Sequence, residues 1–255
     1  MHAYTGCLTW LLIIAAGFVA GILNSLAGGG SFLTFPSLVL AGLPSVAANA
    51  SSTVALVPGA FSTCFGFREE VTRLHEPKLK IWLAVCFVGG LLGAILLLHT
   101  SDRAFRQIAP WLLLFATVLF AFGNPISVAM RGRLHGNQVS MLCLLFPIAV
   151  YGGYFGGGIG IMILAAFRLY GMTDMLAMNG IKALLSATLN AIAAALFIFS
   201  HLIWWPQTLV LMAAGIAGGF AGPMLARRLS ARVLRTVVIT VGVLMTVWFF
   251  EQAGK

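Results

Sequence analysis

The chain alternates between long apolar stretches and short polar connections. Eight of the stretches are about long enough to cross a bilayer as helices: Tyr4–Leu26, Val46–Phe67, Ile81–His99, Gln107–Phe122, Gln138–Phe155, Met175–Ser200, Thr208–Ala226 and Val233–Phe250. No strand-like alternation of apolar and polar residues competes with this pattern. The pattern therefore predicts an all-α polytopic membrane protein.

Two glycine triplets, Gly28–Gly30 and Gly156–Gly158, interrupt apolar sequence about half a chain apart. Each triplet is followed by a short apolar segment, residues 31–43 and residues 159–170. As helices these segments would be about 20 Å long or less, which is shorter than the hydrocarbon core of a bilayer. Consecutive glycines favour a break in a helix. We therefore expect each short segment to be a half-helix that completes a broken span or folds back as a re-entrant hairpin.

Counting the short segments, each half of the chain holds five hydrophobic segments. Because five is odd, the halves are predicted to be inverted repeats, residues 1–124 and 138–255, with a cytoplasmic linker at 125–137. The charges of the loops agree with this topology. With loop 68–80 in the cytoplasm, ten Lys and Arg residues fall on that side and three on the other, as the positive-inside rule requires.

The composition supports a membrane protein and argues against a soluble domain or a nucleic-acid-binding protein. Of the 255 residues, 60% are hydrophobic and 8% are charged, so a polar surface could not cover a soluble domain of this size. The formal net charge of +9 comes from basic loops between spans and not from a nucleic-acid-binding module. No spacing typical of a metal site, a cofactor site or an acid–base pair is present. The sequence therefore favours a carrier without cofactors or metal over an enzyme.

The glycine triplets point to a central anion site. Irregular backbone at membrane depth is tolerated where it is buried in protein or lines a cavity. Half-helices in two inverted repeats are a common feature of transporter sites, and their N-termini attract anions. Close helix packing at the glycines is the competing interpretation.

Polar residues near the triplets complete the candidate site. Lys182 has no carboxylate nearby in the sequence, and an ionisable residue inside a membrane is a functional hypothesis by default. Three simpler roles stay open: Asn49 and Asn179 as N-caps that open long helices, hydroxyls bonded to their own helices, and Lys182 extending to the interface. The candidate substrate-binding residues are Asn24, Gly28, Gly29, Gly30, Ser31, Asn49, Ser51, Ser52, Thr53, Gly156, Gly157, Gly158, Asn179, Lys182, Ser186 and Asn190.

The first half resembles the signature of a known family. The stretch "GFVAGILNSLAGGGSFLTFPSLVLAGLPSVAANASSTVAL" is similar to the first repeat of the TauE/SafE family of small bacterial permeases. The match rests on Asn24, Gly28–Gly30, Pro36, Gly42–Pro44 and Ala48–Thr53. The resemblance implies a multi-pass protein of the bacterial inner membrane that moves sulfite, sulfoacetate or related oxyanions.

The sequence is therefore interpreted as a secondary transporter that works by alternating access and exports sulfite or an organosulfonate. Its expected partners are the lipid bilayer and a small anion, with a homo-oligomer left open. Two alternatives stay open: an uptake carrier for thiosulfate or another sulfur species, and a redox protein that depends on its scattered cysteines, Cys7, Cys64, Cys86 and Cys143.

Overall fold

The computed structural model describes residues 2–26, 29–69, 78–129, 137–226 and 231–253, and every regular element in them is an α-helix. The first half contains α1 (His2–Leu26), α2 (Ser31–Leu40), α3 (Ser45–Gly66), α5 (Leu79–Leu98) and α6 (Asp102–Ala129). The second half contains α7 (Gln138–Tyr154), α8 (Ile159–Tyr170), α9 (Met175–Phe199), α10 (Trp205–Ala226) and α11 (Ala231–Ala253).

This helix order confirms the predicted all-α polytopic fold. Within the described residues, four helices have segments that are long and apolar enough to cross a membrane, namely Gly6–Asn24, Leu79–Leu98, Asp102–Gly123 and Met175–Phe199. The two segments after the glycine triplets form the short helices α2 and α8, of 10 and 12 residues. Residues 125–129, the first part of the predicted linker at 125–137, continue α6, which ends at Ala129.

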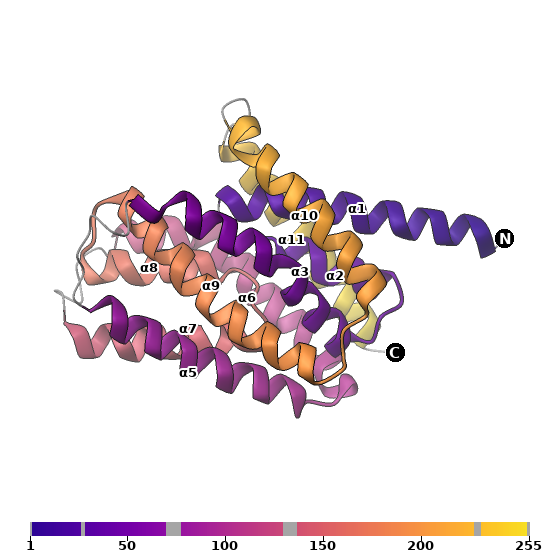
Figure 1. Cartoon of the computed structure of the whole chain (residues 1–255), viewed down its shortest axis with the longest axis horizontal. Coiled ribbons are helices and arrows are strands. Elements are labelled where there is room, and N and C mark those ends of the chain that lie inside the picture. Colours follow the sequence, from indigo (N-terminus) through magenta and orange to yellow (C-terminus); the bar gives the residue numbers. More distant parts are fainter. Residues whose placement is uncertain (1, 27–28, 70–77, 130–136, 227–230, 254–255) are drawn as a thin grey trace.

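The main contacts between helices of the first half and helices of the second half occur in equivalent pairs. Helix α1 packs against α10 and α7 packs against α5, while α3 packs against both α9 and α10, and α9 against both α3 and α5. Figure 1 shows the α1–α10 pair on one side, the α5–α7 pair on the other, and α3 and α9 between them. The two halves are therefore interleaved, since α5 and α10 each pack against helices of the other half. Their opposite orientation in a membrane stays a prediction.

Glycines bring the paired helices into backbone contact. A Cβ atom on Gly21 of α1 would overlap the carbonyl oxygen of Gly215 on α10. In the other pair, a Cβ atom on Gly153 of α7 would overlap the carbonyl oxygen of Gly90 on α5. Small residues allow such close packing between apolar helices in a membrane. Both equivalent interfaces are thus built by the same device.

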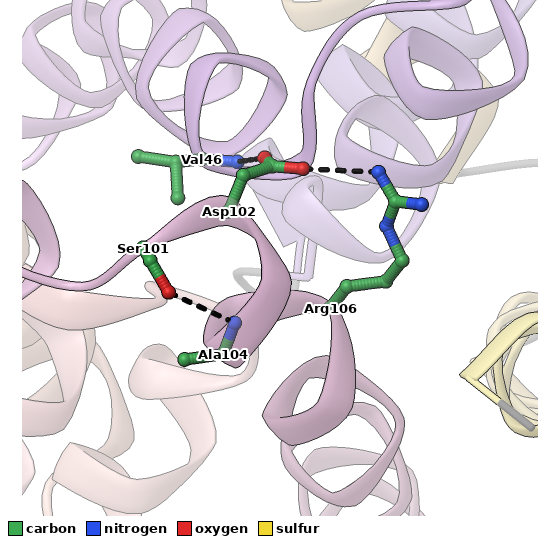
Figure 2. A network of polar contacts seen from close by, with 5 residues as sticks. All are labelled: Val46, Ser101, Asp102, Ala104 and Arg106. Carbon is green, nitrogen blue, oxygen red and sulfur yellow. Dashed lines mark hydrogen bonds and ion pairs between the residues drawn. The ribbon is translucent and has the colours of Figure 1, made fainter.

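The two helices that carry the central polar residues begin before Asn49 and Asn179. Helix α3 begins at Ser45, directly after Pro44, and the Val46 N–H donates to Asp102 Oδ1 at 3.0 Å (Figure 2). Asp102 comes from the start of α6 and also accepts from Arg106 Nη2 at 3.0 Å. Its carboxylate therefore caps the N-terminus of a helix distant in the sequence, where negative charge is stabilising.

Helix α9 is capped from within its own segment. The Asp174 side chain accepts hydrogen bonds from the N–H groups of Leu176 and Ala177. The alternative interpretation of Asn49 and Asn179 as N-caps is therefore wrong. Both asparagines lie one helical turn inside their helices, because Pro44 and Asp174 supply the start signals five residues earlier.

The close α1–α10 contact predicts that glycine-to-alanine substitutions at two positions of α1 change the melting temperature differently. Gly21→Ala should lower the melting temperature in detergent, because the methyl group would collide with backbone and cost about 1–3 kcal/mol. Gly6→Ala in the same helix has no atom within 4 Å of the new Cβ and gains helix propensity. Its melting temperature should be unchanged or higher, and equal destabilisation by both substitutions would contradict the proposed packing.

Candidate functional site

A polar cavity lies where the two short helices meet α3 and α9. Its volume is about 40 Å³, which is room for roughly three water molecules. It is lined by residues of α1, α2, α3, α8 and α9, and by the second glycine triplet: Asn24, Ser31, Thr53, Leu56, Ala60, Thr63, Gly156, Ile159, Gly160, Lys182, Ala183, Ser186 and Asn190.

Both short helices begin at this cavity. Ser31 is the first residue of α2, and Ile159 is the first residue of α8. Neither terminus is capped by a side chain, because the residues before them are Gly30 and Gly158. An uncapped helix N-terminus carries partial positive charge. Two such termini therefore give the cavity a positive potential.

The second triplet requires glycine for its backbone conformation. Gly156 has φ of +79° and Gly158 has φ of +77°, a region that L side chains rarely adopt. Tyr151 donates its hydroxyl hydrogen to the Gly157 carbonyl at 2.9 Å and so holds the break in place. A Cβ atom on Gly156 would lie 3.8 Å from Ser31 Oγ, which brings the break before α8 next to the start of α2.

Lys182 is the one charged residue among those that line the cavity. It is 4% exposed, and its Nζ donates to Asn179 Oδ1 at 3.1 Å. In the part of the chain that the structure describes, no carboxylate lies within ion-pair distance of it. One turn further along α9, the Ser186 hydroxyl oxygen is buried without a hydrogen-bond partner. The Lys182 side chain is thus enclosed by protein and does not extend to the protein surface.

Asn49 has a structural role that the sequence did not reveal. Its Nδ2 donates to the Tyr154 carbonyl at 2.9 Å, at the C-terminal end of α7 just before the second triplet. Carbonyl groups in the last turn of a helix lack intrahelical partners. Asn179, the counterpart of Asn49, donates instead to the Met175 carbonyl of its own helix. The two asparagines therefore have different roles. Asn49 donates to a carbonyl at the helix break, and Asn179 accepts a hydrogen bond from Lys182.

The neighbouring hydroxyls are mostly occupied by structural bonds. Ser51 Oγ accepts from the Trp204 N–H at 3.2 Å, which ties α3 to the start of α10. Ser52 Oγ and Thr34 Oγ1 are 2.6 Å apart and join α3 to α2. Thr53 donates back to the Asn49 carbonyl and also lines the cavity.

The structure thus brings seven of the predicted site residues to the cavity: Asn24, Ser31, Thr53, Gly156, Lys182, Ser186 and Asn190. Gly29, Gly30, Asn49, Ser51, Ser52, Gly157, Gly158 and Asn179 lie outside its lining, and Gly28 is outside the described residues. Sequence reasoning missed six lining residues: Leu56, Ala60, Thr63, Ile159, Gly160 and Ala183. The spacing of the first three from Thr53 follows one face of α3 and could have indicated them.

One cluster of aromatic rings fills the space beside the second triplet. Phe35 of α2 packs against Phe105, Phe155 and Phe249, with ring centroids 5.3–5.9 Å apart. All four side chains are at most 2% exposed. This apolar cluster fixes α2 against α6, α11 and the end of α7, and so it holds the start of α2 in position.

Comparison with known proteins places the chain in a family. Residues 13–249 match the sequence model of the family described as "Sulfite exporter TauE/SafE". A "Probable membrane transporter protein" of Haemophilus influenzae is 28% identical over 246 residues, which cover 95% of each chain. "Probable membrane transporter protein YfcA" of Escherichia coli is 27% identical over 92% of this chain and 87% of its own. No solved structure matches the chain.

The asymmetry of the two asparagines generates a testable difference. Asn49→Ala should cost about 1–3 kcal/mol of stability, because it leaves the buried Tyr154 carbonyl without its donor. The matched control is Asn179→Ala in a Lys182→Met background, where no buried ammonium loses its partner, and relative to Lys182→Met it should cost less than half as much. Thermal unfolding of both variants in detergent measures the difference. Equal losses would show that the Asn49–Tyr154 bond does not support the break.

Proposed function

The chain belongs to the sulfite exporter TauE/SafE family of membrane transporters, and on this premise we propose that its central cavity carries a small oxyanion, most directly sulfite, across the membrane. Export is the proposed direction, in line with the description of the family. The binding site would be the cavity between the starts of α2 and α8 and the facing sides of α3 and α9.

The buried Lys182 is the observation that carries this proposal. An ammonium group taken out of water is costly unless an opposite charge compensates it. Its hydrogen-bond partner, the Asn179 amide, is neutral, and the residues around the cavity include no acid. A bound anion would supply the missing charge. Two uncapped helix N-termini at the same cavity would add to the attraction, by about 0.3–1 kcal/mol each.

The size and the polar groups of the cavity favour a compact anion. About 40 Å³ is room for roughly three water molecules, and a sulfite-sized ion is comparable to that. The lining offers amide and hydroxyl groups from Asn24, Thr53 and Asn190 that could replace water around oxyanion oxygens. Leu56 and Ile159 are apolar and limit the space for a carbon chain. Sulfite therefore fits this conformation better than a longer organosulfonate.

The interleaved packing suggests which parts would move. Alternating access by rocking of the two sequence halves would separate α5 and α10 from the helices they pack against. We infer instead that one moving unit combines α1–α3 with α10, and the other combines α7–α9 with α5. The cavity lies where these units meet, as expected for a transporter site between repeats.

A thiol-dependent role has no support in this arrangement. The four cysteines lie on α1, α3, α5 and α7, and none of them lines the cavity. A redox function would need at least one thiol near the substrate or near a second thiol. The cavity chemistry therefore favours the carrier over the redox alternative.

Lys182→Met should weaken sulfite binding ten- to a hundredfold, because a charged hydrogen bond of about 1.5–3 kcal/mol is lost. Sulfite-dependent thermal stabilisation of the purified protein in anaerobic detergent solution gives the dissociation constant. Sulfate, thiosulfate, sulfoacetate and a carboxylate serve as competing ligands for specificity.

Lys80→Met is the matched control, because Lys80 is exposed in the first turn of α5, outside the cavity lining. Its affinity for sulfite should equal that of the wild type. Equal affinity in the wild type and Lys182→Met would remove Lys182 from the site. No stabilisation by any of the anions, together with no sulfite flux in proteoliposomes, would overturn the proposed function.

A further inference from the structure

We propose that Lys182 also couples transport to protons, so that net transport moves one proton with each monovalent anion in the same direction. Without net transport, the carrier exchanges one anion for another. This inference rests on the function proposed above and adds a second transported species to it. The positive charge of Lys182 must be neutralised whenever the side chain is enclosed in the protein.

Lys182 has no titratable neighbour in the cavity. Helices α3, α5, α7 and α8 pack against α9, and the titratable groups within their described parts lie outside the cavity lining: Cys64, Lys80, Cys86, Cys143, Tyr151, Tyr154, Arg168 and Tyr170. Arg168 contacts Met175 Sδ, and Tyr151 donates to the Gly157 carbonyl. Asp174 of α9 itself caps the helix start. No side chain described there can therefore accept the Lys182 proton or balance its charge.

The empty carrier then has two ways to return. While an anion is bound, the ion and the ammonium form a neutral pair that can be enclosed at both ends of the cavity. After the anion leaves, an enclosed ammonium would have only the neutral Asn179 amide, which is strongly unfavourable. The carrier can bind another anion and return with it, which is exchange. It can also lose the proton from Nζ to water at the open side and return with a neutral amine.

The second route moves a proton. On the original side the Nζ lone pair takes a proton from water, and the ammonium binds the next anion. One cycle thus transfers one anion and one proton, and no net charge for a monoanion. The surroundings suit both forms of the side chain. Either form can donate to Asn179 Oδ1, and the unpartnered Ser186 hydroxyl, one turn along the same face, can donate to the lone pair of the amine.

Proteoliposomes containing the full-length protein test this inference. Radiolabelled methanesulfonate is the probe, because it has three sulfonyl oxygens, a single methyl group and one charge that does not titrate in the range used. A potassium gradient with valinomycin sets the membrane potential, and a trapped pH dye follows protons. For the wild type we expect net uptake to be driven at least tenfold above background by acid outside. One proton should enter per anion, and exchange at equal pH should move no protons.

Lys182→Arg assigns the coupling to this residue. A guanidinium stays charged in proteins and cannot lose the proton. The variant should therefore still exchange anions above background, at a lower rate than the wild type, and lose net uptake driven by the pH gradient. Lys80→Arg, at an exposed position, should behave as the wild type in both assays. If Lys182→Arg fails to fold or to exchange, the ratio of protons to anions measured on the wild type decides the question.

The outcomes separate this inference from the function on which it rests. Exchange by the wild type without protons accompanying net uptake would overturn the coupling and leave the anion carrier standing. Net uptake driven by the pH gradient in Lys182→Arg would also overturn the assignment to Lys182. A wild type that neither exchanges nor accumulates methanesulfonate or sulfite would overturn the proposed function itself.

Discussion

A helix can break inside a membrane protein only if the freed backbone groups and the charges near them find partners in the protein or in its ligand. This constraint shapes the centre of the molecule, where α7 ends and α8 begins. The Tyr154 carbonyl takes the Asn49 amide, and the Gly157 carbonyl takes the Tyr151 hydroxyl. The N-termini of α2 and α8 stay uncapped by side chains and lie at the cavity beside Lys182. The helix N-termini and Lys182 thus carry positive charge that the protein does not balance there, and this charge is complementary to an anion.

The surrounding helices make this arrangement rigid by close packing. Glycine contacts hold α1 against α10 and α5 against α7, so each pair joins helices from both halves of the chain. The Asp102 carboxylate, on the first residue of α6, fixes the start of α3. The cavity is therefore framed by two interleaved units, and a proposed movement of one unit against the other would change access to it from either side.

Much of the architecture could be predicted from the sequence, because apolar length and glycine triplets are local signals. The short helices α2 and α8 follow directly from the triplets, and Lys182 is conspicuous as a cation in an apolar segment. The helices start before Asn49 and Asn179 because Pro44 and Asp174 are stronger start signals than the asparagines that follow them.

The role of Asn49 could not be predicted in the same way. Its partner is a backbone carbonyl 105 residues away, which no pattern in the sequence marks. The cavity walls formed by Ala60 and Thr63 also depend on which face of α3 meets α9. Local physics thus predicts where helices form and break, while the partner of each polar group follows from tertiary packing.

The central claim is that an oxyanion binds beside Lys182 between the two short helices. Crystals of the protein grown with selenite, a heavier analogue of sulfite, test it through diffraction at the selenium absorption edge. We expect an anomalous peak inside the cavity that places an oxyanion oxygen about 3 Å from Lys182 Nζ. Selenium peaks that lie only outside the cavity, with Lys182 still bonded to Asn179 alone, would contradict the account.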